Sequence, residues 1–173
     1  NAAADYDGYA DFVISLDSVL FQGQGESQPE ADDWSVSSSG VVIDSGTNET
    51  GTGTANIDIG IDPDRSWGVG DQGLLQFSNS FGTLSGDGLA SSFGDTEFSI
   101  TVENTSQKRI NFSFSYTAFV SADITADNGE DAGAYASIEL FDDFSDELLF
   151  TSADAFIGGP LADSSDISRT LLF

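Results

Sequence analysis

The stretch INFSFSYTAFVSADI, residues Ile110–Ile124, decides the fold class of this chain. Apolar and polar side chains alternate along it with a period of two residues, as in a β-strand that has one buried and one exposed face. The apolar set is Ile110, Phe112, Phe114, Tyr116, Val120 and Ile124, and the polar set is Asn111, Ser113, Ser115, Thr117, Ser121 and Asp123. A strand of this kind needs further strands to cover its apolar face.

The same period recurs in most other apolar segments, and no stretch shows a sustained helical face. We expect about nine strands, over Tyr9–Phe21, Trp34–Ile43, Thr54–Ile61, Leu74–Phe81, Phe98–Val102, Ile110–Ile124, Ala134–Phe141, Glu147–Phe156 and Ile167–Phe173. Residues 44–53 and 82–97, rich in Gly, Ser, Thr and Asp, are expected to be loops, and residues 142–146 a tight turn. Short strands joined by Gly-rich turns predict a single antiparallel β-sandwich of Greek-key or jelly-roll type.

Three parts are expected along the chain. Residues 1–21 form an N-terminal segment with an amphipathic strand, residues 22–33 a flexible polar linker, and residues 34–173 the sandwich body. Such a linker has a relaxed span of about 20 Å and reaches about 40 Å. The N-terminal strand can therefore pair within its own chain or be donated to the sheet of a neighbouring subunit. The side chains that would fill the neighbour's core are Phe12, Ile14, Leu16 and Leu20.

Composition and charge exclude several classes of function. The 173 residues hold 30 Asp and Glu against 4 Lys and Arg, a net charge of -26, with 39% hydrophobic residues, enough for a packed core. This charge would repel nucleic acid and anionic membranes, whereas divalent cations or a salt-rich medium suit it. The chain has no Cys and no His. Nucleophilic triads, zinc sites, haem and iron-sulfur ligation are therefore unavailable, and we expect a protein that is not an enzyme.

The acidic loops are candidates for calcium, which takes oxygen ligands from Asp, Asn and backbone carbonyls. The three clusters are Asp127, Asn128, Glu130 and Asp131; then Asp62, Asp64 and Asp71; then Asp142, Asp143 and Asp146. None has the spacing of an EF-hand, and for each a solvated acidic loop is the alternative.

Trp67 is the candidate ligand-binding residue, because an indole can stack on a sugar ring. The favoured alternative is that Trp67 caps the core of the sandwich. Separately, Asn48, Asn104 and Asn111 begin Asn-x-Ser/Thr sequences, a short pattern that arises by chance in a chain rich in Ser and Thr.

The segment Val102–Phe150 has an Asn-Ser turn before a strand rich in Phe and Tyr. An Ala- and Ser-rich stretch follows and leads to a hairpin with an Asp-rich tip. This order resembles exported bacterial proteins of the PEP-CTERM kind, many of them cyanobacterial. The resemblance implies export and a surface or matrix role, and it carries over no catalytic residue. The C-terminal Pro-Glu-Pro motif, hydrophobic helix and basic tail of such proteins are not in this sequence.

The small residues Asn1–Ala4 and the lack of Met are typical of a chain processed by signal peptidase, so we expect a secreted, extracellular or cell-surface protein. The leading hypothesis is a self-associating structural subunit of an extracellular filament, surface layer or matrix, assembled by donation of the N-terminal strand. A monomeric module that binds carbohydrate or calcium is the alternative. A small glycan-active enzyme with two carboxylates is the third.

Overall fold

The computed structural model describes residues 3–23, 27–127, 131–141, 147–157 and 159–172, with the backbone alone at residues 74–76. Within these ranges the chain forms β1 (Ala4–Phe21), η1 (Ala31–Asp33), β2 (Trp34–Ile61), β3 (Arg65–Ser66), β4 (Gln72–Asn104), β5 (Ile110–Ala126), β6 (Gly133–Phe141), β7 (Glu147–Phe156) and β8 (Ala162–Leu172). The prediction of an all-β protein is confirmed. The described residues include no helix that is long and apolar enough to cross a membrane.

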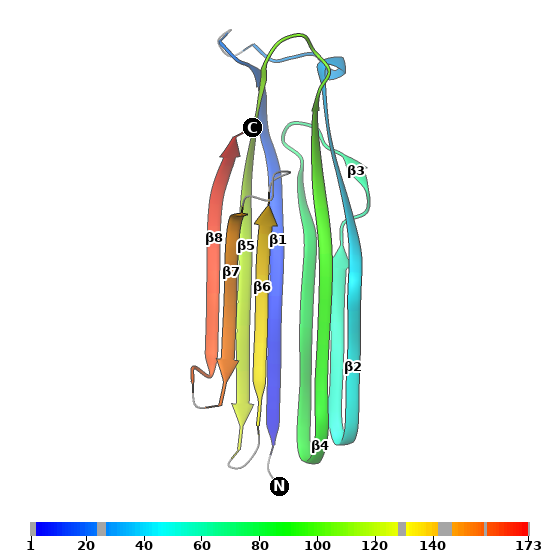
Figure 1. Cartoon of the computed structure of the whole chain (residues 1–173), viewed down its shortest axis with the longest axis vertical. Helices are drawn as coiled ribbons and strands as arrows, with labels where there is room; N and C mark the ends of the chain where they lie inside the picture. Colours follow the sequence, from blue (N-terminus) through cyan, green and yellow to red (C-terminus); the bar gives the residue numbers. More distant parts are fainter. Residues whose placement is uncertain (1–2, 24–26, 128–130, 142–146, 158, 173) are drawn as a thin grey trace.

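The strands form antiparallel sheets that run along the long axis of the molecule (Figure 1). The larger sheet has six strands in the order β3-β2-β4-β1-β5-β8, and β6 and β7 form a two-stranded sheet. Strand β1 pairs with β4 along one edge and with β5 along the other. The N-terminal segment is therefore a central strand of the chain's own sheet.

Strands β2 and β4 form one long ribbon, in which Trp34 pairs with Asn104 at one end and Ile61 with Gln76 at the other. Near Gly51 the register shifts and the ribbon turns back on itself, at the lower end of Figure 1. Gly51 has a φ of 64°, a conformation that favours glycine. The expectation of loops at 44–53 and 82–97 is wrong, because these stretches pair with each other across the ribbon.

The folded ribbon produces the two layers of the sandwich. Its first-layer half, residues 53–61 paired with 76–84, continues the sheet beside β1. Its second-layer half, residues 34–51 paired with 88–104, lies over that sheet. The ring of Phe98 in this half stacks on the ring of Phe12 in β1, with 4.9 Å between centroids. Strand β6 also lies over β1, since a Cβ added to Gly8 would come within 2.9 Å of the carbonyl oxygen of Tyr135.

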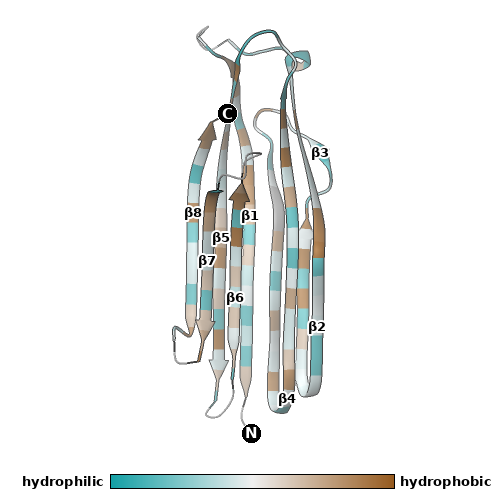
Figure 2. Ribbon diagram, in the orientation of Figure 1, coloured by the Kyte–Doolittle hydropathy of each residue, from teal (hydrophilic) through white to brown (hydrophobic). Residues whose placement is uncertain are grey.

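The core lies between these layers and follows the predicted alternation. All six apolar residues predicted to face one way on Ile110–Ile124 are buried, and bands of hydrophobic and hydrophilic residues alternate along the strands in Figure 2. Phe12, Ile14 and Leu16 of β1 are buried as well. The prediction that Leu20 faces inward with these residues is wrong. A register shift between Leu16 and Ser18 turns the residues that follow to the opposite face of the sheet. Val19 is 2% exposed in its place, and Leu20 is only half-buried.

Candidate functional site

The second layer of the sandwich is interrupted by a groove. Strand β6 pairs with β7 along one edge, and residues 88–95 of β4 pair with β2 along one edge. Within the described chain, no strand pairs with the other edge of β6 or of residues 88–95. The groove between these two edges has a volume of about 1280 Å³. Its walls are therefore backbone edges that can pair with another strand, and one of their carbonyls, that of Ser92, already accepts a hydrogen bond from the Ser80 hydroxyl at 2.6 Å.

The floor of the groove comes from the first layer. Its residues are Ala4, Tyr6, Gly8 and Ala10 of β1, with Ser78 and Ser80 of β4. Apart from Tyr6 these side chains are small, whereas further along β1 the large side chains of Phe12, Ile14 and Leu16 fill the space between the layers. The groove therefore lies over the part of β1 that carries the least side-chain volume, and it leaves room for apolar side chains that enter from the second layer.

Both walls run in the same direction as β1. Residues 88–95 begin close to the start of β1, because the ribbon turns back after Leu84, which pairs with Ala4. Strand β6 begins at the same end, because Ala126 at the end of β5 also pairs with Ala4. Figure 1 shows this common direction of β6, β1 and the second half of β4. One strand placed between the walls and running the opposite way would be antiparallel to both of them.

The rim of the groove combines exposed apolar side chains with acids. Ile43, Leu89, Phe93, Tyr135 and Phe141 line it and are 45% to 59% exposed. The acids that line it are Asp5, Asp95, Glu97, Asp131 and Glu139, and none of the described lining residues is Lys or Arg. This combination favours an apolar or basic segment and repels an acidic one.

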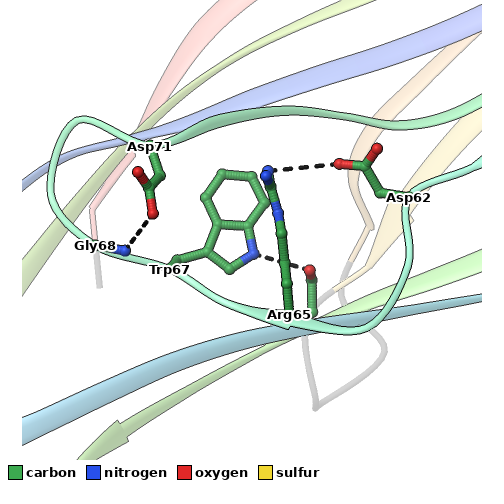
Figure 3. A network of polar contacts seen from close by, with 6 residues as sticks. Asp62, Arg65, Trp67, Gly68 and Asp71 are labelled. Atoms are coloured by element: carbon green, nitrogen blue, oxygen red, sulfur yellow. Dashed lines mark hydrogen bonds and ion pairs between the residues drawn. The ribbon is translucent and has the colours of Figure 1, made fainter.

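Trp67 does not line the groove and lies in the loop between β3 and β4 (Figure 3). It is 4% exposed, and its indole N–H donates a hydrogen bond to the hydroxyl of Ser38 at 2.8 Å. The guanidinium carbon of Arg65 lies 3.9 Å from the centre of the indole ring. The indole therefore has no open face for a sugar ring, which corrects its assignment as a ligand-binding residue. The structure agrees with the alternative that Trp67 caps the core.

The acids on either side of Trp67 interact with neighbouring groups of the chain. The guanidinium of Arg65 lies 3.4 Å from a carboxylate oxygen of Asp62, and Asp71 accepts a hydrogen bond from the backbone N–H of Gly68 at 2.7 Å. Asp64 is exposed. A cation of the protein thus occupies the position beside Asp62 that calcium was predicted to take. Across the described part of the chain, no three metal-ligating side chains lie close enough to hold a metal ion.

Of the loop at 127–131, the structure describes Asp127 and Asp131, while Asn128 and Glu130 lie outside the described residues. The carboxylate of Asp127 accepts a hydrogen bond from the backbone N–H of Ala3 at 3.2 Å. The cluster at 142–146 also lies outside the described residues. A calcium site in either place stays a prediction.

Two groups on the outer face of the first layer have raised pKa values. Asp7 pairs with Asp123 on β5, and partial burial together with the charge of Asp123 raises the pKa of the Asp7 carboxyl. Partial burial and a hydrogen bond donated to Asp11 at 2.9 Å raise the pKa of Tyr9 to about 12. Neither group lines the groove.

No family model, curated protein or solved structure matches this chain. The resemblance to PEP-CTERM proteins therefore stays a prediction. Sequence reasoning identified a strand that could be donated, but it did not identify an acceptor. The groove results from the fold of the β2–β4 ribbon. That ribbon was not predicted, because residues 44–53 and 82–97 were expected to be loops.

Proposed function

We propose that this protein is a structural subunit of an extracellular filament, surface layer or matrix, and that subunits assemble when the groove of one copy receives a β-strand of another. The observation that carries the proposal is the pair of unpaired strand edges that run in the same direction on either side of the groove. Proteins use such edges to bind extended segments through main-chain hydrogen bonds.

The size of the edges is sufficient for a stable contact. Strand β6 offers nine residues, Gly133–Phe141, and an inserted strand would pair with it and with residues 88–95 at once. Each main-chain hydrogen bond contributes about 0.5 to 1.5 kcal/mol, and association costs about 4 to 15 kcal/mol. Two ladders, together with burial of the apolar rim, can offset that cost. A single edge contact would do so less readily.

A contact between the groove of one copy and a strand of the next joins two different surfaces. Such a head-to-tail contact continues from subunit to subunit unless the rotation closes a ring, and it produces filaments. The extracellular location is part of the proposal. It is supported by the resemblance of residues 102–150 to exported proteins.

The proposal is tested by filling the groove from its floor. Ala10→Trp places an indole in the groove, and Ser121→Trp places one on the outer face of β5 as a matched control. We expect the wild-type chain and Ser121→Trp to form large species by sedimentation velocity and filaments or layers by negative-stain imaging, and Ala10→Trp to remain monomeric. A wild-type chain that stays monomeric at millimolar concentration, or an Ala10→Trp variant that assembles like the wild type, would contradict the proposal.

Carbohydrate binding is the second candidate, and one observation favours it. The rings of Tyr9 and Phe119 lie side by side on the outer face of the first layer, with 6.0 Å between centroids, next to the carboxylate of Asp11. Aromatic faces beside hydrogen-bond acceptors suit a neutral sugar. The test is sedimentation of the protein with insoluble cellulose or chitin. Loss of this binding in Tyr9→Ala/Phe119→Ala would support the candidate, and no binding by the wild type would remove it.

A further inference from the structure

Strand β8 is an edge strand of the larger sheet. It pairs with β5 along one edge, and no strand of the described chain pairs with its other edge. None of its residues is buried, and Leu172 is 76% exposed, the highest value among the exposed large hydrophobic residues of the described chain. Strand β7 also has one free edge, but Leu149, Ala153 and Ala155 hold it in the core. Ile167 and Leu171 are half-buried and pack against the core, and β8 gives up this packing if it leaves its place.

The second half of β8, residues 167–172, carries Arg169 and no acid, whereas Asp163 and Asp166 lie in its first half. Of the four basic residues, Arg65 pairs with Asp62, and Lys108 and Arg109 lie between strands β4 and β5. Arg169 is the remaining one, and it lies in β8 with its side chain exposed and no ion pair in the described chain. The groove is lined by five acids. Arg169 is therefore the cation that β8 would bring to the groove, on the same side of the strand as Ile167 and Leu171.

The pattern and length of β8 fit the groove. Ile167, Arg169 and Leu171 pair with Ala118, Tyr116 and Phe114, which are all buried, so the three β8 side chains lie on the core-facing side of the sheet. In the groove the same side would face the small residues of the floor. β8 has 11 residues, and the nine residues of β6 span about 30 Å. One strand of this length covers the whole wall.

We infer that the strand received by the groove is β8 of a second copy, inserted antiparallel to both β6 and residues 88–95 of β4. This inference rests on the proposed function. In its own chain β8 forms one ladder, with β5. In the groove it forms two ladders and covers the apolar rim, which is the physical reason for the exchange. Strands β1 and β5 and residues 76–84 of β4 are paired along both edges and cannot leave without opening the sheet.

The test uses reversible disulfide bonds between introduced cysteines, called locks here. The chain has no cysteine of its own that could form a competing disulfide. Thr117 and Ser168 pair across β5 and β8 with their hydroxyl oxygens 3.2 Å apart, so Thr117→Cys/Ser168→Cys ties β8 to its own chain. The matched lock is Ser15→Cys/Ser115→Cys, between β1 and β5, where the hydroxyl oxygens are 2.7 Å apart. Assembly of both variants is measured by sedimentation velocity before and after reduction.

We expect the oxidised Thr117→Cys/Ser168→Cys variant to sediment as a monomer and to assemble after reduction, which shows that the variant folds. The oxidised Ser15→Cys/Ser115→Cys variant should assemble like the wild type. Equal assembly of the first variant in both redox states would overturn the inference and leave the proposed function standing. Loss of assembly in the Ser15→Cys/Ser115→Cys lock alone would overturn it in favour of the N-terminal strand. A wild-type chain that never assembles would overturn both proposals.

Discussion

Phe12→Ala tests whether β1 belongs to its own chain or to a neighbour. Phe12 is 0% exposed, and its ring stacks on Phe98 and Tyr116 with centroid distances of 4.9 and 5.3 Å. Truncation of a buried Phe costs about 3 to 5 kcal/mol, and the two ring contacts place this residue in the upper part of that range. We expect a loss of about 4 kcal/mol in the free energy of unfolding. For a chain of this size, that loss lowers the melting temperature by about 8 to 16 °C.

The assay is urea unfolding followed by the fluorescence of Trp34 and Trp67, repeated over a hundredfold range of protein concentration below the onset of assembly. Because Phe12 packs within its own chain, the midpoint should not depend on concentration. Val13→Ala is the matched control, since Val13 is the half-buried next residue on the opposite face of β1, and it should cost about 1 kcal/mol or less. A loss below about 1 kcal/mol for Phe12→Ala, or a midpoint that rises with concentration, would refute the placement of β1.

Three further predictions follow from the outer face and the acidic loops. The raised pKa of Asp7 means that the folded state keeps this proton longer than the unfolded state, so its carboxyl costs stability as pH rises. Asp7→Asn should therefore raise the melting temperature at pH 7 and raise it less at pH 3; equal shifts at both would contradict the raised pKa of Asp7. The pKa of Tyr9 near 12 predicts that stability falls as pH rises from 10 to 12. Tyr9→Phe should flatten this fall in melting curves at pH 9 and 11, and an unchanged slope would contradict it. A calcium site at 127–131 should make calcium raise the melting temperature more than sodium at equal ionic strength. Asp127→Asn/Asp131→Asn should abolish that difference, and equal melting temperatures for the wild-type chain in the two salts would exclude the site.

The strands with clear alternation could be predicted from the sequence to within a few residues. Residues 110–124 alternate strictly because one face packs against the second layer, and the structure extends this strand only to Ala126. The N-terminal strand was also predicted, but its bulge was not. The pattern Leu16-Asp17-Ser18-Val19-Leu20 is compatible with either Val19 or Leu20 facing inward, and only pairing with β5 decides between them.

The ribbon and the groove could not be predicted, for a related reason. Residues 44–53 are small or polar on both faces, and in residues 88–95 Leu89 and Phe93 alone interrupt the small and polar residues, so periodicity gives little signal and the Gly content indicates a loop. Main-chain hydrogen bonds of the ladder define these strands, and such bonds leave little trace in residue type. The edges of β6 and β4 come together only when the ribbon has folded, so the groove depends on contacts between distant parts of the chain.

The shape of the β2–β4 ribbon also has a consequence for how the chain folds. Its innermost pair, Ile61 with Gln76, closes a short loop, and each later pair extends the ladder outward to Trp34 with Asn104. Every pair formed brings the next two residues together, so the entropy of closing a long loop is never lost in one step. We expect the ribbon to zip from residues 61 and 76 in one early phase, faster than its large sequence separations suggest. Capture of β1 between β4 and β5, whose pairs lie far apart in sequence, then becomes the slow event.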